Sequence, residues 1–254
     1  MSGSNALPTR REAVARLRDA GLAEPAAETV VAHLVAADAA GKPGHGLSRI
    51  PWLESLLGQS IDASSGPERM EASESFERWH GRGALGYLTM AAICDGLRAE
   101  PPERVRLVVA EACFPTGMLG GWARTIADVG LVAVVTATSP RRLPHPEGGP
   151  PLTGTNPIAI AVPSSEGRPL VADVSMGAVT HGDVLAGKAR PEELVPFGGP
   201  SAHKAFALAV GVELLVGALA GPEHGAIVVA ARPDHDPVPA FRALAGALRL
   251  PGDR

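Results

Sequence analysis

The segment Gly44-His45-Gly46-Leu47-Ser48-Arg49 holds two side chains suited to acid–base chemistry on a small acid. His45 lies between two glycines, so a ligand can reach an imidazole that exchanges a proton near pH 7. Arg49 follows four residues later, and a guanidinium group matches a carboxylate in geometry. His45 and Arg49 are therefore candidate catalytic residues, and Arg49 is also a candidate for binding the substrate. By spacing alone, a surface turn with a capping histidine remains the simpler interpretation.

Two further segments place polar residues beside predicted strands. Thr155 and Asn156 lead through a proline into the apolar run 158–162, where the Asn156 amide could face a ligand. A turn before the strand explains the same pattern. Asp173 lies at the end of the apolar run 170–174, at the kind of sheet edge where α/β proteins bind ligands. It would equally cap the next turn.

A third segment, His203-Lys204, precedes a long apolar helix. Backbone N–H groups and a cation at the start of a helix favour an anion or a phosphate, although a solvated helix start fits as well. Only three of the 23 basic residues are lysines. A lysine at a candidate site, such as Lys204, is therefore less expected by chance.

Two motif-like strings predict no site. Residues 81–86 match G-x-G-x-x-G, but the residues before them are polar and hardly strand-like, which favours a helix-start turn over a dinucleotide loop. Asp234-His235-Asp236 lies in a turn flanked by prolines and reads as surface. The remaining histidines lack the spacing of zinc ligands, so no metal site is predicted.

Hydrophobic periodicity predicts the elements that position these residues. A reciprocal cap of Thr9 and Glu12 begins the first helix, residues 61–77 form a loop or an edge strand, and residues 177–200 are irregular. Further helices are expected over 25–40, 50–57, 84–99, 117–129, 202–220 and 239–248, and strands over 105–110, 131–138, 158–162, 170–174 and 226–231. Helices followed by mixed strands and helices predict an α/β fold with a mixed sheet and flanking helices.

Composition excludes several classes of protein. The chain has 254 residues, 45% of them hydrophobic and 20% charged, which is typical of a globular protein and not of a disordered one. A net charge of -4 does not favour binding to nucleic acid or to an anionic membrane. Two cysteines are too few for a disulfide framework. We expect no signal peptide and no spanning helix, and hence a soluble, cytoplasmic protein.

Four strings together resemble the malate/L-lactate dehydrogenase family, whose NAD(P)-dependent reductases do not use a Rossmann fold. They are HGLSR at 45–49, GTNPIAIAVP at 154–163, DVSMGAV at 173–179 and HKAFALAVGVELL at 203–215. The resemblance implies one family domain over 1–254, with a helical lobe over about 1–80 packing against helices of about 202–254. A central α/β lobe would cover about 81–201.

The resemblance also implies roles for the candidate residues. His45 would donate a proton to a 2-oxo acid or a cyclic imine, and Arg49 would hold its carboxylate, with Thr155 and Asn156 binding substrate. The cofactor would be NADPH or NADH, and the protein a homodimer with its active site near the subunit boundary. The residues implied to contact the cofactor are Asp173, Val174, Ser175, Met176, Gly177, His203 and Lys204.

Departures from the family pattern keep a second function open. The family's long segment before the lysine helix is nearly absent, with only 182–199 remaining, and the C-terminal tail is short. Several family residues are replaced, by Gly44, Ala137, Gly177, Ala205 and the run Phe114-Pro115-Thr116-Gly117. The alternative is a cofactor-independent acid–base enzyme, a dehydratase, isomerase, cyclase or decarboxylase of a biosynthetic pathway. A non-catalytic subunit is a third class, which the retained His45 and Arg49 disfavour.

Overall fold

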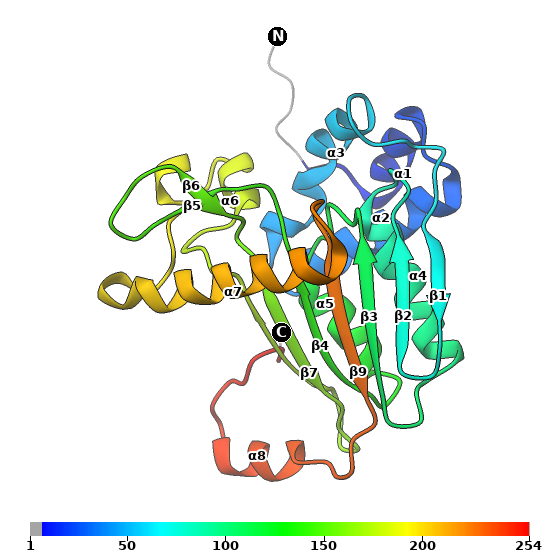
Figure 1. Cartoon of the computed structure of the whole chain (residues 1–254), viewed down its shortest axis with the longest axis vertical. Coiled ribbons are helices and arrows are strands. Elements are labelled where there is room, and N and C mark those ends of the chain that lie inside the picture. The colour runs from blue at the N-terminus through cyan, green and yellow to red at the C-terminus, as the bar shows by residue number, and fades with distance from the viewer. Residues whose placement is uncertain (1–6, 254) are drawn as a thin grey trace.

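The computed structural model describes residues 7–253, which form one α/β unit around a mixed seven-stranded sheet (Figure 1). This confirms the predicted fold class. The sheet order is β1-β2-β3-β9-β4-β7-β8, and a short β5–β6 pair stands apart. The strands are β1 (Glu68–Ala72), β2 (Phe76–His80), β3 (Val105–Glu111), β4 (Val132–Ala137), β5 (Leu143–Pro144), β6 (Pro151–Thr153), β7 (Ile158–Val162), β8 (Leu170–Val174) and β9 (Ala226–Ala231). The helices are α1 (Arg10–Asp19), α2 (Glu24–Ala39), α3 (Ile50–Leu57), α4 (Gly86–Ala99), α5 (Leu119–Ala127), α6 (His181–Leu185), α7 (Ala202–Ala220) and α8 (Val238–Ala245), with 3₁₀ turns at Pro43–His45, Leu47–Arg49, Pro191–Glu193 and Gly199–Ser201.

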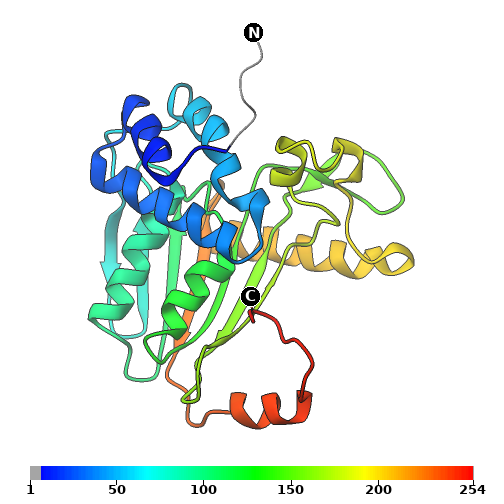
Figure 2. The same ribbon diagram turned by 180° about the vertical axis from the view of Figure 1, so that it is seen from behind.

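Helices cover the two faces of the sheet unequally (Figures 1 and 2). On one face, α4 and α5 lie against the strands, with α1, α2 and α3 outside them, and this side holds the main hydrophobic core. On the other face, α7 crosses the sheet, where Val212 and Val216 pack against Val109 of β3 and Ile227 of β9. Within this chain the sheet therefore lies between α7 and the N-terminal helices, which the resemblance implied would pack together.

Residues 61–77, expected as a loop or an edge strand, include the edge strand β1, whereas β2 was not predicted. β2 pairs in parallel with β3, and β1 forms the exposed edge, so residues 68–80 belong to the sheet and not to a separate helical lobe. β2 does not show the usual alternation of apolar and polar residues, because Glu77, a charged residue, occupies a buried position in it. The Glu77 carboxylate accepts hydrogen bonds from Arg106 Nη1 at 3.0 Å and Trp79 Nε1 at 2.9 Å. A buried ion pair replaces the apolar residue that periodicity requires.

The glycine-rich string 81–86 does follow a strand and open a helix, contrary to the sequence-based expectation of no strand. It nevertheless forms the predicted helix-start turn. Gly86 N donates to Phe114 O at 3.2 Å, and a Cβ on Gly86 would lie 2.7 Å from Phe114 N. Backbone of the loop after β3 thus occupies the space that a phosphate would need in a dinucleotide loop.

Segment Gly199–Ala220 is, by length and composition alone, long and apolar enough to cross a membrane, although the sequence predicted no such run. It lies across the sheet in this structure (Figure 1). Glu213, which interrupts the apolar run, accepts hydrogen bonds from Asn156 Nδ2 at 2.6 Å and Gly154 N at 3.3 Å. These bonds tie α7 to the turn before β7.

His33 of α2 is the polar centre of the core on the helical side. Its ring is 7% exposed, stacks on Trp122 at 4.0 Å between centroids, and accepts a hydrogen bond at Nε2 from Met118 N at 2.9 Å. Burial lowers the pKa of His33 to about 4, so the ring is neutral at pH 7. A neutral His33 therefore holds the start of α5 in place.

Protonation of His33 is expected to destabilise the fold. Because its folded pKa of about 4 lies below the unfolded value near 6.5, its contribution is complete above pH 6.5 and is lost as pH falls toward 4. The full loss is about 3 kcal/mol in free energy of unfolding. Urea unfolding of the wild type and His33→Gln from pH 7.5 to 4 should show a smaller pH dependence in the variant. Equal pH dependence would contradict this role.

Candidate active site

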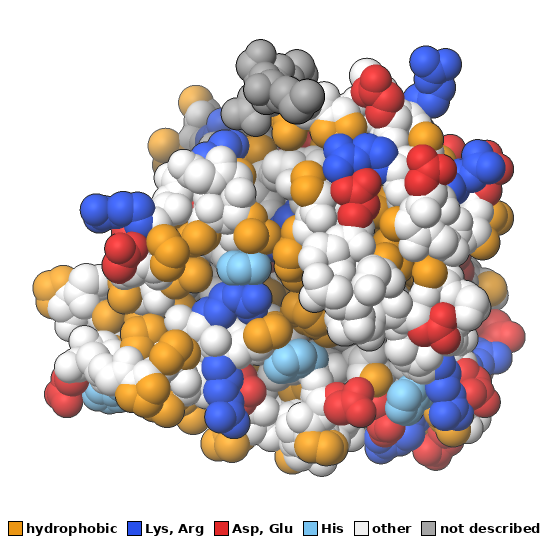
Figure 3. Space-filling view, turned by 90° about the horizontal axis from the view of Figure 1, so that it is seen from above, with side chains coloured by type: hydrophobic (Ala, Val, Ile, Leu, Met, Phe, Trp, Pro, Cys, Tyr) orange, Lys and Arg blue, Asp and Glu red, His pale blue; other side chains and the backbone are white. Residues whose placement is uncertain are grey.

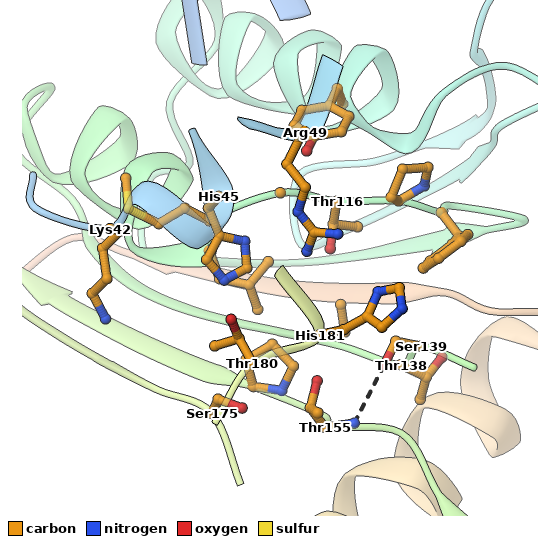
Figure 4. A pocket seen from close by; sticks show the side chains of 18 of the residues that line it. Lys42, His45, Arg49, Thr116, Thr138, Ser139, Thr155, Ser175, Thr180 and His181 are labelled. Carbon is orange, nitrogen blue, oxygen red and sulfur yellow. Dashed lines mark hydrogen bonds between the residues drawn. The ribbon is translucent and has the colours of Figure 1, made fainter. Parts of the chain in front are cut away.

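A small cavity of about 110 Å³ opens where the carboxyl ends of β3 and β4 meet the turn that carries His45 and Arg49 (Figure 4). The space-filling view from above shows histidine and basic side chains gathered around the hollow of this face (Figure 3). The cavity brings together five predicted residues, namely His45, Arg49, Thr155, Asp173 and Ser175. Residues 114–117, which depart from the family pattern, line it as well.

His45 ends the first 3₁₀ turn and faces the cavity (Figure 4). Its Nδ1 atom is buried and has no hydrogen-bond partner among the described residues. Burial, followed by the positive charge of Arg49, lowers the pKa of His45 to about 3. The imidazole is therefore neutral in the empty cavity, with a polar atom free for a ligand.

Arg49 is held rigidly although it makes no ion pair within residues 7–253. Its side chain is 8% exposed, Nε donates to Gly44 O at 2.8 Å, and the guanidinium lies 4.7 Å from the centroid of the Trp52 ring. Nη1 is buried without a partner. Because an unpaired buried charge is costly, this geometry favours an anionic ligand at Nη1.

Two glycines allow α6 to close over this turn. A Cβ on Gly44 would lie 2.7 Å from Asp183 Oδ1, and one on Gly182 would overlap the backbone of Gly44. Thr180 and Asp183 form a capping box at the start of α6, in which Asp183 accepts hydrogen bonds from Thr180 N at 3.0 Å and Thr180 Oγ1 at 2.6 Å. The short segment after β8 thus covers the cavity with α6, and Gly44 is the replacement that permits it.

Thr155 and Asn156 have separate positions. Thr155 lines the cavity, whereas Asn156 is fully buried behind it. The Asn156 Nδ2 atom donates to Ala209 O at 2.9 Å and to Glu213, both on α7. The Asn156 amide nitrogen thus joins two parts of the fold, while its Oδ1 atom is buried without a hydrogen-bond partner among the described residues. The contact of Asn156 with substrate stays a prediction.

The stretch 173–177 contributes alternate residues to the site. Asp173 and Ser175 line the cavity, while Val174 is exposed on the opposite face of the sheet. Met176 is buried beside Ala209, and Gly177 forms a bridge with Pro196. Strand geometry explains the split, because successive side chains point to opposite faces.

His203 and Lys204 lie outside the site. Both are exposed on the first turn of α7, and neither lines the cavity or its neighbour. Their contact with a cofactor stays a prediction.

Several lining residues were not singled out from the sequence. Arg142 comes from the Pro/Gly loop before β5, and His181 begins α6 in a segment without periodicity. Lys42 lies three residues before His45, and the scarcity of lysine was the signal that could have identified it. Other lining residues that were missed are Trp52, Tyr87, Thr138, Ser139 and Thr180.

A second cavity of about 590 Å³ adjoins the first and shares Lys42, Met118 and Asp173 with it. It runs to Arg124 and to the C-terminal residues 249–252. Arg124 Nη2 donates to Gly252 O at 2.8 Å, which fixes the tail against α5. Cations beside glycine backbone suit the diphosphate of a nicotinamide dinucleotide, so the described residues fit such a cofactor.

The electrostatics of the first cavity favour anions. Three cationic side chains line it, Lys42, Arg49 and Arg142, against one carboxylate, Asp173. Asp173 Oδ2 lies 4.0 Å from Lys42 Nζ, and burial raises the pKa of this carboxyl. Among residues 7–253, no cluster of histidine, cysteine or carboxylate side chains could hold a metal ion.

Comparison with known proteins agrees with this geometry. The model of the malate/L-lactate dehydrogenase family matches residues 8–194. A (2R)-3-sulfolactate dehydrogenase (NADP(+)) of Chromohalobacter salexigens is 32% identical over 84% of this chain and 71% of its own length. A Delta(1)-pyrroline-2-carboxylate/Delta(1)-piperideine-2-carboxylate reductase of Pseudomonas putida is 28% identical over 79% of this chain and 66% of its own.

The solved structures include a dehydrogenase from Sinorhizobium meliloti. It superposes with a TM-score of 0.82 at 26% identity, covering 94% of this chain and 84% of that one. The chain spans about two thirds of the length of the two sequence relatives above. On the family match over most of its length and on the shared fold, this chain belongs to the malate/L-lactate dehydrogenase family of oxidoreductases.

Proposed function

We propose that this protein reduces a small 2-oxo acid or a cyclic imino acid with a nicotinamide dinucleotide, NADPH or NADH. The observation that carries the proposal is the pair of buried, unpartnered atoms in one cavity, His45 Nδ1 and Arg49 Nη1. One is suited to move a proton and the other to bind a carboxylate. The relatives named above support it, as they act on sulfolactate and on cyclic imino acids.

Arg49 acts first in this scheme. Its Nε donates a hydrogen bond to Gly44 O, and its guanidinium lies over the Trp52 ring. These two contacts hold the guanidinium in place and leave Nη1 to bind the substrate carboxylate. This fixes the adjacent carbonyl or imine relative to His45. Prior orientation lowers the entropic part of the barrier.

His45 then provides the proton that the reduced oxygen or nitrogen needs. In the empty cavity it is neutral, partly because of the positive charge of Arg49. A bound carboxylate offsets that charge, so substrate binding raises the pKa of His45 and favours the protonated donor. In the reverse direction, the neutral imidazole is ready to accept a proton.

The cofactor would extend from the first cavity into the second. There Arg124 and Arg249 supply positive charge, and Lys42 with Asp173 lies at the junction. When bound, the nicotinamide would deliver a hydride to the substrate carbon.

A cofactor-independent acid–base enzyme is the second candidate. It is favoured by the position of His203 and Lys204, which lie outside both cavities. In that case His45 and Arg49 would keep their proposed roles while the second cavity stayed unused. Direct measurement of cofactor binding separates the two candidates.

We also propose that the protein acts in the cytoplasm as a homodimer. Cys94 and Cys113 are both free buried thiols, as a reducing compartment allows. Below α7 the sheet face is bare in Figure 1, and a row of partly exposed apolar side chains crosses it. The row consists of Leu107, Val229, Val134 and Ile160, which are paired across neighbouring strands. An apolar sheet face is stable when another surface covers it, and a second copy is the proposed cover.

Binding of NADPH or NADH to the purified protein tests the choice between the two enzyme classes. Calorimetry or nucleotide fluorescence should give a Kd in the micromolar range for one of them, about -8 kcal/mol. Arg249→Gln should weaken it, while Arg190→Gln, an exposed arginine that lines neither cavity, serves as control. No binding at millimolar nucleotide would exclude the reductase and favour the cofactor-independent enzyme.

Replacing His45 tests the proton donor. A screen of 2-oxo acids and cyclic imines provides the substrate, and His45→Ala should then lower kcat by about 10²–10⁴-fold. The fold should persist, because His45 makes no side-chain hydrogen bond with the described residues. The exposed His235→Ala is the matched control and should leave kcat unchanged. Unchanged turnover in His45→Ala would remove the residue from the mechanism.

Charging the bare sheet face tests the dimer. Ile160 is 42% exposed, so Ile160→Glu should be tolerated in the monomer but not when buried against a second copy. Light scattering should show a dimer for the wild type and a monomer for Ile160→Glu. Met70→Glu, on the exposed edge strand β1, should stay dimeric. A monomeric wild type or a dimeric Ile160→Glu would contradict this surface.

A further inference from the structure

Arg142 is the cation of the cavity that the proposed mechanism does not use. It lies in the loop between β4 and β5, where its backbone N donates to Thr153 O at 2.7 Å. Its Nη1 donates to Pro140 O at 3.1 Å, which orients the guanidinium and leaves its other N–H groups available. The side chain is half-buried and lines the cavity.

No carboxylate neutralises Arg142 within residues 7–253. Burial and the charge of Arg49 lower the pKa of Arg142, so the two guanidinium groups are near enough to repel each other. The one carboxylate that lines the cavity, Asp173, lies beside Lys42, and Asp183 accepts a hydrogen bond from Thr180. Two like charges that face one cavity favour an anionic ligand there.

His181 lies beside Arg142 at one end of the cavity. The charge of Arg142, after burial, is the next cause that lowers the pKa of His181 to about 4. In Figure 4, His181, Ser139 and Thr138 lie on one side of the cavity, and Lys42 and Ser175 lie on the other. The end that holds Lys42 continues into the second cavity, whereas the end with His181 does not. A group bound beside His181 would therefore belong to the substrate and not to a cofactor.

From this arrangement we infer that Arg142, with His181, forms a second anion subsite, and that the substrate carries a further acidic group besides the carboxylate at Arg49. The inference rests on the proposed function and narrows it to dianionic 2-oxo or 2-hydroxy acids, with a second carboxylate or a sulfonate. Arg142 is then a specificity-determining residue, since a monoanionic acid would leave its charge unpaired in the closed cavity.

Binding of two matched acids tests the subsite without turnover. Malate and lactate share the 2-hydroxy acid group, and malate adds a second carboxylate. Both enantiomers of each are titrated by calorimetry with and without NADPH or NADH, the reduced nucleotides, with which a 2-hydroxy acid does not react. Wild type should bind malate at least 10-fold more tightly than lactate. Arg142→Gln should weaken malate about 10- to 100-fold and change lactate by less than threefold. Sulfolactate should follow malate.

Neighbouring variants make the result specific. The exposed Arg141→Gln, one residue away, should leave both acids unchanged. Arg49→Gln should weaken both, because both carry the shared carboxylate. Equal loss of malate and lactate in Arg142→Gln, or no preference for malate in the wild type, would overturn the second subsite while leaving the reductase intact. If neither acid, nor any 2-oxo acid or cyclic imine, is bound or turned over, the proposed function itself fails.

Discussion

Arg49 carries a buried positive charge with no carboxylate partner in the described chain, and much of the site exists to hold it. The backbone of Gly44 and the ring of Trp52 fix the guanidinium from two sides. Such a charge is stable in the folded state only when polar contacts and its future ligand compensate for lost hydration. The turn at 43–49, the start of α3 and the cover by α6 together bury Nη1 without a hydrogen-bond partner among the described residues.

Two glycines allow α6 to pack closely over the turn that carries His45. Where α6 meets the turn that carries His45, both surfaces are glycine, Gly44 and Gly182, and either side chain would prevent the approach. The short helix α6 therefore packs directly on the turn that carries His45. It brings His181 to the cavity wall and Asp183 against Gly44.

The sequence was most informative where local physics decides the structure. The bounds of α3, α7, β7, β8 and β9 agree with the predicted ranges, because apolar runs between turn residues set them. β2 was missed since Glu77 and Arg106 are buried as a pair, a contact between residues far apart in sequence. The same distinction between local and tertiary contacts applies to the residues of the candidate site. His45 and Arg49 lie in one turn and were predicted together, whereas Arg142 and His181 meet only through the tertiary fold. The bond from the Asn156 amide to Glu213 was not predicted, because Glu213 is distant in the chain.

The same electrostatics that draw an acid into the cavity also control the proton. His45 is neutral there because it is buried and because Arg49 and Lys42 add positive charge. An anion on Arg49 removes part of that effect, so the histidine becomes a better proton carrier only when a substrate is present. A second anionic group beside Arg142 would add to this change through the shared field of the cavity. In the proposed mechanism, the charge of the substrate would therefore set when His45 is protonated, in a cavity lined by three cations and one carboxylate, where the Nδ1 atom of His45 has no partner among the described residues.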